Sequence, residues 1–230
     1  RRKDCNQAQG TLITLGGPSG GLGLAAFVLV PVLVNVWNFM DGIDALAASQ
    51  AMLVAAALAL AGGGPLGLLL GVALAAACLG FLPFNWPKAR VFLGDVGSYV
   101  LGFVVAWLVV LTLDGLPRPQ WPLVLLPLSA FLVDAGLTLA MRILRREPWW
   151  RPHRQHAYQC AARRAGRHGP VATGYAAWTA IGGIMLLWFR GDNVYEVWML
   201  VLLWFTIAAI VWYALRLRDP RAGDLSGGAA

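Results

Sequence analysis

Seven long apolar segments dominate this 230-residue sequence. Each is close to the ~20 residues that a helix needs to cross the hydrocarbon core of a bilayer. They occupy residues 21–37, 46–61, 66–83, 99–113, 121–141, 171–189 and 197–215. Hydrophobic residues make up 59% of the chain and charged residues only 13%, which is far from the composition of a soluble domain. The sequence therefore predicts an all-α, polytopic transmembrane helix bundle with about seven spans.

The connections between these segments are short and rich in turn-forming residues, such as Gly-Gly-Gly-Pro at 62–65 and Asp-Gly-Leu-Pro at 114–117. They leave no room for a second, soluble domain. We therefore expect residues 1–230 to form a single membrane domain.

The basic residues indicate which ends of the spans face the cytoplasm, because Lys and Arg beside a span are retained there. The net charge is +7. If the spans alternate in direction, the basic residues from Lys88 onward fall on one side, with Arg118 and Arg190 as exceptions, while the first ten residues stay unassigned. We expect that side to be cytoplasmic, where it meets anionic headgroups or anionic substrates.

Two aspartates and two asparagines follow one another closely at the end of the first apolar segment, in NVWNFMDGID (35–44). Asn38, Asp41 and Asp44 are spaced by three, which on a helix confines them to an arc of ~120°. A lone aspartate at the edge of a membrane usually caps or solvates a helix end. Four polar residues together favour a binding site, because polar groups are costly in hydrocarbon.

A second polar cluster reads FNWPKARVFLGDVGS, residues 84–98. Gly94 and Gly97 would let a ligand approach the backbone closely. The N–H groups exposed at the start of the following helix favour phosphate. Asp95 and Ser98 have an equally plausible alternative role as a helix N-cap.

The third cluster, REPWWRPHRQHAYQCAARRAGRH at 146–168, contains all three histidines of the chain. His153 and His156 flank Arg154 at a spacing that lets both reach one anion or metal, and the arginines offer bidentate phosphate contacts. A basic run beside a membrane is more often a simple retention signal. Asp134, in the preceding apolar segment, is expected to pair with Arg142 two turns along the same helix, with catalysis as the alternative.

Carboxylates beside Gly, Ser, Arg and His suit a diphosphate substrate that is held through Mg²⁺. This ion takes one or two carboxylates and completes its shell with water and phosphate oxygens. The sequence has no residue cluster suited to a closed zinc site and no Walker-type glycine loop. The pattern therefore favours phosphoryl transfer.

The motifs NFMDGIDALA, FNWPKARVFLGDVGS and HRQHAYQ, in this order, resemble those of the bacterial polyprenyl-phosphate N-acetylhexosamine-1-phosphate transferases, glycosyltransferase family 4. The resemblance covers about residues 35–168. It implies Mg²⁺-dependent transfer of an N-acetylhexosamine 1-phosphate from a UDP-sugar to undecaprenyl phosphate, which releases UMP and initiates a lipid-linked cell-surface glycan. The HRxHAYQ form is more similar to the branch that starts O-antigen-type lipopolysaccharide than to the peptidoglycan branch.

The resemblance also implies roles for single residues. The implied catalytic residues are Asp41, Asp44, Asp95, His153 and His156. Asp95 would be the ligand of Mg²⁺, with Mn²⁺ as an alternative ion. The implied substrate-binding residues are Asn38, Asn85, Phe92, Ser98 and Arg154, with Phe92 lying against the uracil.

The resemblance further implies a multi-pass protein of the bacterial inner membrane whose active site faces the cytoplasm. Its expected partners are the UDP-N-acetylhexosamine, undecaprenyl phosphate and membrane lipids. No nucleic acid is expected among them, and a homodimer is left open.

The sequence departs from the family in two respects. The family has an upstream motif with paired aspartates, and this chain has no adjacent pair of aspartates. The family also has about ten or eleven spans. We therefore expect the chain to be the C-terminal two-thirds of a longer enzyme, beginning just past the paired aspartates. The missing pair favours the alternative of a non-catalytic membrane protein that binds polyprenyl phosphate or a nucleotide sugar.

A transporter is a further alternative, because such proteins use carboxylates inside the membrane for ion coupling. It fits less well, because the charged residues gather at one face and no internal repeat is evident.

Overall fold

The computed structural model describes residues 20–148, 154–189, 191 and 193–217. Within these ranges the chain forms eight α-helices and one 3₁₀ helix, joined by short connections. They are α1 (Gly20–Met40), α2 (Leu46–Ala61), α3 (Gly64–Asn85), α4 (Gly94–Gly115), η1 (Arg118–Leu125), α5 (Ser129–Leu144), α6 (Ala157–Ala165), α7 (Gly169–Trp188) and α8 (Val194–Leu217). The prediction of an all-α bundle is confirmed.

Five of the described helices are long and apolar enough to cross a membrane: α3, α4, α7, α8 and the Leu22–Met40 part of α1. Each of the seven apolar segments found in the sequence forms a helix or, in one case, the bent pair η1 and α5. The 16 residues of α2 are apolar but span only about 24 Å, which is short for a full crossing. By length and composition the structure therefore has five spans, or six if the bent pair counts as one.

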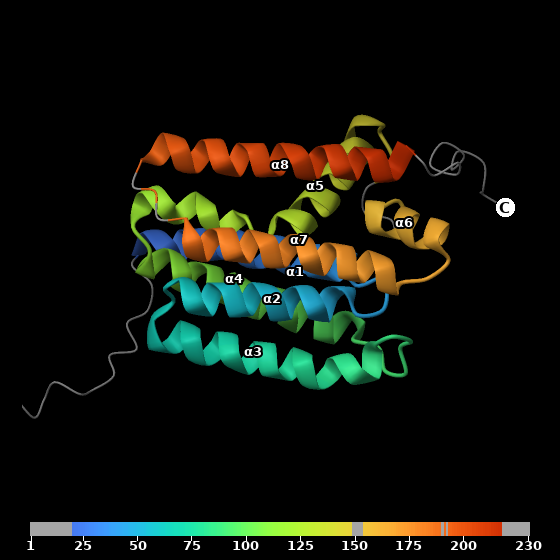
Figure 1. The fold of residues 1–230 in the computed structure, drawn as a ribbon, viewed down its shortest axis with the longest axis horizontal. Helices are drawn as coiled ribbons and strands as arrows, with labels where there is room; N and C mark the ends of the chain where they lie inside the picture. The colour runs from blue at the N-terminus through green and yellow to red at the C-terminus, as the bar shows by residue number, and fades with distance from the viewer. Residues whose placement is uncertain (1–19, 149–153, 190, 192, 218–230) are drawn as a thin grey trace, which may run out of the picture.

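The segment 121–141, which the sequence presents as one span, is broken in the structure. The helices η1 and α5 meet at an angle of 70°, and α5 leans away from the direction of its neighbours (Figure 1). Pro127 lies at the break, between the end of η1 and the start of α5. A proline lacks the backbone N–H and clashes with the preceding turn, so it accounts for a bend at this position.

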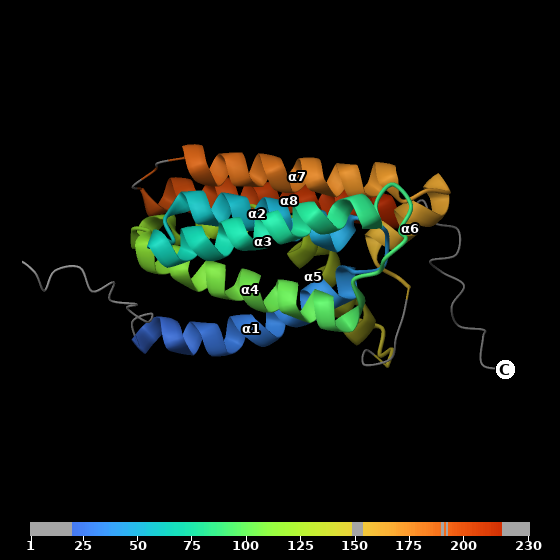
Figure 2. The ribbon, with the colours of Figure 1, turned by 90° about the horizontal axis from the view of Figure 1, so that it is seen from below.

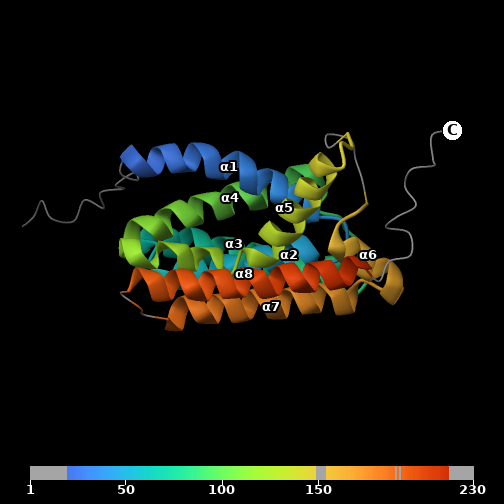
Figure 3. The same ribbon diagram turned by 90° about the horizontal axis from the view of Figure 1, so that it is seen from above.

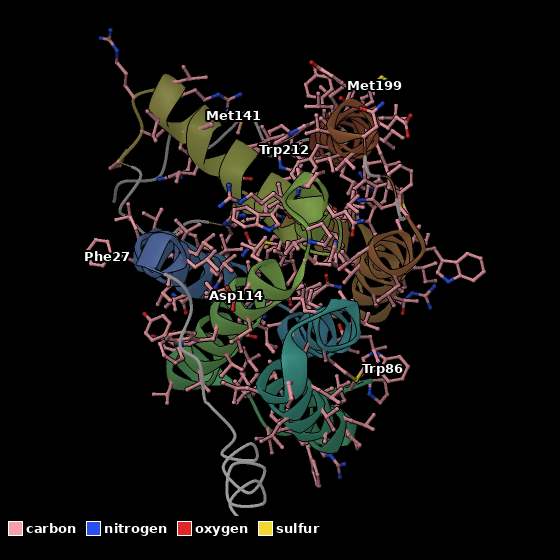
Figure 4. All side chains as sticks on the ribbon, turned by 90° about the vertical axis from the view of Figure 1, so that its left-hand side faces the viewer. Phe27, Trp86, Asp114, Met141, Met199 and Trp212 are labelled. Carbon is pink, nitrogen blue, oxygen red and sulfur yellow. The ribbon has the colours of Figure 1, made fainter. Side chains whose placement is uncertain are left out.

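The helices lie side by side along one direction. On one flank α1 packs on α4, and on the opposite flank lie α7 and α8 (Figures 2 and 3). Between them α2 packs against α3, α4 and α7, and most of its residues are buried. At the periphery, Phe27 and Met199 point away from the bundle (Figure 4). Exposed apolar side chains of this kind are expected on helices that face lipid.

Because the helices alternate in direction, the three sequence motifs meet at one end of the bundle. This end, which we call the motif end, is formed by residues 41–45, 86–93 and 154–168. The short helix α6 lies here, near the first turn of α7 and the last turns of α8 (Figure 1). Asp114 lies at the other end, which faces the viewer in Figure 4.

A close crossing of α1 and α4 sets the geometry of the motif end. A Cβ added to Gly102 of α4 would lie 2.6 Å from the carbonyl oxygen of Leu33 and 2.6 Å from the Cα of Val34, both in α1. Only glycine lets the two backbones approach so closely. The two helices run in opposite directions, so the end of α1 and the start of α4 reach the motif end together.

A cavity of about 410 Å³ lies between α5, α6, α7 and α8. Most of its lining is apolar, with Arg164 and Asp134 among the polar exceptions. Neither Asp41 nor Asp95 is among the described residues that line this cavity. The cavity therefore borders the third polar cluster, through Arg164, but not the two aspartates of the first and second clusters.

Candidate active site

The crossing of α1 and α4 brings Asp41 and Asp95 to the same level. The Ser98 hydroxyl lies 3.1 Å from the Oδ1 of Asn38. This contact aligns α4 with α1 about one helical turn away from the two carboxylates. Asp41 follows Asn38 by three residues, and Asp95 precedes Ser98 by three. Two carboxylates distant in sequence therefore lie together at the surface of the motif end.

These two carboxylates affect each other electrostatically. Asp95 is exposed and Asp41 is half-buried. Burial, together with the negative charge of Asp95, raises the pKa of Asp41 from 3.8 to about 6. In the part of the chain that the structure describes, no basic residue forms an ion pair with either group. Within the described ranges, the pair therefore presents negative charge without an ion-paired cation.

This pair is suited to a divalent cation that is shared with a substrate. The described residues contain no group of three or more His, Cys, Asp or Glu side chains that could enclose a metal ion. Mg²⁺ does not require such a cage, because one or two carboxylates, water and phosphate oxygens are enough. Asp95, with Asp41 beside it, fits this incomplete coordination shell.

The backbone explains why Asp95 is accessible. Gly94 has a φ of 66°, which lets the 86–93 loop turn sharply into α4, and Asp95 follows in the first turn. The alternative role of Asp95 and Ser98 as a helix N-cap is not observed, because Leu93 is the N-cap residue and makes no side-chain cap hydrogen bond. The positive end of the helix dipole still favours negative charge at this position.

Asp44 lies in a different environment from Asp41. Its Oδ2 accepts a hydrogen bond from the backbone N–H of Ala89 at 3.2 Å and lies 3.2 Å from Nδ1 of His168. The same Nδ1 lies 3.3 Å from the backbone nitrogen of Asp44. A neutral His168 can accept that N–H, and a protonated one can donate to the carboxylate. Asp44 thus joins the first motif to the 86–93 loop and to the start of α7.

His168 was not among the predicted site residues. In the sequence it is the last residue of the arginine-rich stretch, just before the Gly-Pro that opens α7, and nothing there points to Asp44, which is 124 residues away. Only the fold reveals the contact.

Asn85 braces two of the loops. Its Oδ1 accepts a hydrogen bond from the N–H of Ala45 at 2.7 Å, and its Nδ2 donates to the carbonyl oxygen of Val91 at 2.9 Å. The side chain is buried, and both ends of its amide have partners within the protein. Contact of Asn85 with a nucleoside stays a prediction.

Three other predicted residues differ in their exposure. Phe92 is 76% exposed on the loop before α4, where a flat ring can stack on it. Arg154 is exposed at the motif end. Ser98 is fully buried, and its hydroxyl lies 3.1 Å from the backbone oxygen of Asp95 as well as from Asn38. A phosphate contact by Ser98 would require this hydroxyl to turn away from α1.

The histidine motif folds against the first motif. His153 lies outside the described residues. His156 is 3% exposed, and its ring stacks near those of Phe39 and Tyr158, with centroid distances of 6.3 and 5.7 Å. The Tyr158 hydroxyl donates to the carbonyl oxygen of Phe39 at 3.0 Å.

Gly42 is needed where Tyr158 packs. A Cβ added to Gly42 would overlap the Tyr158 hydroxyl and lie 3.1 Å from its Cζ atom. Burial, followed by the negative charges of Asp134 and Asp41, raises the pKa of Tyr158 well above its usual value. The phenol therefore stays protonated and remains a donor to Phe39.

The predicted ion pair between Asp134 and Arg142 is wrong. Arg142 instead forms an ion pair with Glu147, at 3.0 Å. The chain turns back after α5, and the N–H of Glu147 reaches the carbonyl oxygen of Arg142, which brings the acid beside the guanidinium. Asp134 lies 3.5 Å from His156 instead.

Comparison with known proteins gives a family match that includes the first two motifs. Residues 9–113 match glycosyl transferase family 4. One similar protein is a phospho-N-acetylmuramoyl-pentapeptide-transferase of Synechococcus sp. (strain JA-3-3Ab), which is 45% identical over 139 residues, covering 58% of this chain and 38% of that protein.

Two further relatives come from other bacteria. A decaprenyl-phosphate N-acetylglucosaminephosphotransferase of Mycobacterium tuberculosis (strain CDC 1551 / Oshkosh) is 34% identical over 127 residues, covering 43% of this chain and 31% of that protein. A probable undecaprenyl-phosphate N-acetylglucosaminyl 1-phosphate transferase of Bacillus subtilis (strain 168) is 33% identical over 135 residues, covering 55% and 36%.

The chain thus spans between about three and four tenths of the length of each of these relatives. Their names include both an N-acetylmuramoyl-pentapeptide and an N-acetylglucosamine substrate, so they do not select one sugar. The sequence match over residues 9–113 and the all-helical membrane fold point the same way: this chain is similar to glycosyl transferase family 4.

Proposed function

We propose that the protein transfers an N-acetylhexosamine 1-phosphate from a UDP-sugar to undecaprenyl phosphate, with release of UMP, at the motif end of the bundle. The observation that carries this proposal is the pair Asp41 and Asp95, two carboxylates that lie together at the edge of the membrane without a described protein cation. Evolutionary relatives that are named for the same class of reaction support it.

The acceptor needs no strong base. A phosphate monoester has a second pKa of about 6, so the acceptor is mostly dianionic at neutral pH. One of its oxygens attacks the β-phosphorus of the UDP-sugar and forms a new P–O bond. The bond from that phosphorus to the oxygen that bridges to the α-phosphate breaks, and UMP leaves with the electron pair. The main obstacle is repulsion between two polyanions.

The site residues address that obstacle by position and charge. Asp95, assisted by Asp41, would hold Mg²⁺, which would neutralise negative charge on the diphosphate when bound. Arg154 is exposed and basic, which suits a phosphate contact. Phe92 is exposed on the neighbouring loop, which suits stacking on the uracil.

We also propose that the motif end faces the cytoplasm of a bacterial inner membrane, where UDP-sugars are made. The excess of Lys and Arg at this end supports the orientation. The HRxHAYQ form of the third motif supports a donor of the kind that starts O-antigen-type glycans.

The test is a transfer assay in membranes that carry the protein as its gene encodes it. Radiolabelled UDP-N-acetylglucosamine and undecaprenyl phosphate are supplied with Mg²⁺, and label is measured in butanol-extractable lipid. We expect label in the lipid, a loss of at least about 10³-fold in Asp95→Asn, and full activity in Asp114→Asn, because Asp114 is an exposed aspartate at the other end of the bundle.

If the folded protein transfers no label to lipid, either from this donor or from UDP-N-acetylmuramoyl-pentapeptide, the proposal is contradicted. Binding of UDP-sugar without turnover would instead support the non-catalytic alternative.

A further inference from the structure

Asp134 is the most completely satisfied acid among the described residues, although it lies within an apolar helix. It is 1% exposed. Its Oδ1 accepts hydrogen bonds from the N–H of Ala157 at 2.8 Å and from Thr138 at 3.3 Å. Its Oδ2 accepts from the N–H of Tyr158 at 3.0 Å and from the Tyr175 hydroxyl at 2.6 Å. The carboxylate therefore ties α5 to both α6 and α7.

Two of these donors are the first N–H groups of α6. The opening N–H groups of a helix have no partner within the helix, and the helix dipole places partial positive charge there. Asp134 supplies the missing acceptor and the negative charge from a neighbouring helix. The start of α6 is thus fixed relative to α5 by a carboxylate that is distant in sequence.

The same carboxylate reaches the candidate active site through His156, which immediately precedes α6. Nδ1 of His156 lies 3.5 Å from Oδ1 of Asp134. On its other side the imidazole stacks near Phe39, two residues before Asp41. Tyr158, whose N–H bonds to Asp134, holds the Phe39 carbonyl with its hydroxyl. Asp134 and the Asn38–Asp44 segment therefore hold the histidine motif between them.

Another charged group reaches this network only indirectly. Arg216 of α8 lies 3.5 Å from the Thr138 hydroxyl, which in turn bonds to Asp134. Arg142 is engaged by Glu147. Within the described residues, His156 is the one basic side chain within 4 Å of the Asp134 carboxylate.

We propose that Asp134 is a positioning residue of the transfer reaction, which fixes His156 and the start of α6 against the Asn38–Asp44 segment. This inference rests on the proposed function. Asp134 acts through His156 and Tyr158 and does not itself touch substrate. A purely structural carboxylate would affect folding without a specific coupling to His156.

The first experiment is a double-mutant cycle in the transfer assay. Asp134→Asn keeps the size of the side chain but removes its charge and replaces one acceptor oxygen with an NH₂ group. We expect kcat to fall about 10- to 100-fold, as for other residues that orient a reacting group, with a KM for the UDP-sugar that changes less than about threefold. In a His156→Gln background the same change should cost nothing more, because its effect passes through His156.

Tyr175→Phe is the matched control. It removes one hydrogen bond from the same carboxylate on the α7 side and leaves the α6 donors and His156 in place. We expect its kcat to stay within about threefold of the original protein. An equal loss of kcat in Tyr175→Phe and Asp134→Asn, or additive losses in the cycle, would overturn the proposal.

The second experiment does not depend on transfer activity. Diethyl pyrocarbonate modifies accessible histidines, and mass spectrometry of the peptides assigns the rate for His156. We expect slow modification in the original protein and in Tyr175→Phe, and a rate at least about tenfold higher in Asp134→Asn, because the start of α6 loosens. An unchanged rate in Asp134→Asn would overturn the proposal.

The two experiments separate the two ideas. If the original protein transfers no sugar phosphate, the proposed function fails, and the modification rates still decide whether Asp134 fixes His156. If the protein is active and Asp134→Asn is equally active, only the positioning role fails.

Discussion

Asp134 and Asp41 both lie near the motif end, but their carboxylates have opposite surroundings. Asp134 is buried and accepts hydrogen bonds from α5, α6 and α7. Asp41 is half-buried, and burial together with the negative charge of Asp95 raises its pKa. A carboxylate with all its acceptor sites used stabilises a fold, whereas one without partners is available to bind a cation. In this protein, therefore, both burial and the supply of hydrogen-bond donors separate Asp134 from Asp41.

The largest expected effect concerns the acid without donors. Asp41→Asn should lower kcat by about 10²- to 10³-fold, more than Asp134→Asn, because it removes charge from the cation site itself. The measurement is the lipid-extraction assay at saturating UDP-sugar, with Asp114→Asn as the control. If Asp134→Asn proves more damaging than Asp41→Asn, our distinction between the two acids is wrong.

The next effect concerns the helix crossing that places Asp41 beside Asp95. Gly102→Ala would force a Cβ against the backbone of Leu33 and Val34, and we expect a loss of about 1–3 kcal/mol in the free energy of unfolding together with reduced turnover. The control is Gly80→Ala in α3, where an added Cβ meets nothing within 4 Å. Thermal denaturation in detergent measures both. If the two variants are equally stable, α1 and α4 can move apart without loss of stability, and the close crossing is not required.

A smaller effect should follow from the contact between the first and third motifs. Gly42→Ala would push the Tyr158 ring away, and we expect about a tenfold loss of kcat. Tyr158→Phe removes the hydroxyl that the new methyl group would meet first. The double variant should therefore be more active than Gly42→Ala alone. A double variant that is worse than either single one would contradict the geometry.

The smallest expected effect is the pH dependence of protein stability that Asp41 confers. Its folded-state pKa of about 6 lies above the ordinary value of 3.8, so the folded protein holds this proton more tightly than the unfolded chain. The associated stability is fully present below pH 3.8 and is lost as the pH rises to about 6 and beyond. At pH 7 without divalent cation, Asp41→Asn should therefore raise Tm by about 3 °C.

Addition of Mg²⁺ sharpens that measurement. A cation bound between the carboxylates should raise the Tm of the original protein more than that of Asp41→Asn, and the difference should fade below pH 6 as Asp41 becomes protonated. Scanning calorimetry with and without EDTA gives both values. An identical response of the two proteins to Mg²⁺ would speak against Asp41 as part of the cation site.

Most of the helical framework is predictable from the sequence, because a chain with long apolar segments has few ways to satisfy its backbone in a membrane. The same argument predicts that two motifs separated by an even number of crossings lie at the same end of the bundle. Two motifs separated by an odd number of crossings lie at opposite ends. The bend between η1 and α5 was missed, although Pro127 marks it.

The site is less predictable, because its contacts depend on which helices pack together. Gly102 determines the approach of α1 to α4, and only that approach makes neighbours of Asp41 and Asp95. Asp134 was expected to find a partner on its own helix, yet its donors come mainly from α6 and α7. Spacing along one helix carries no information about such partners. The contact of Asp44 with His168 was missed for the same reason.

The fit of the Tyr158 ring against Gly42 also limits the order in which the two motifs can change during evolution. A larger residue at position 42 would be tolerated better after the hydroxyl group at position 158 had been lost. The reverse order would pass through a protein in which the Tyr158 ring is displaced from the 41–45 loop and turnover is reduced. Substitutions at these two positions should therefore be inherited together, with the change at 158 preceding the change at 42.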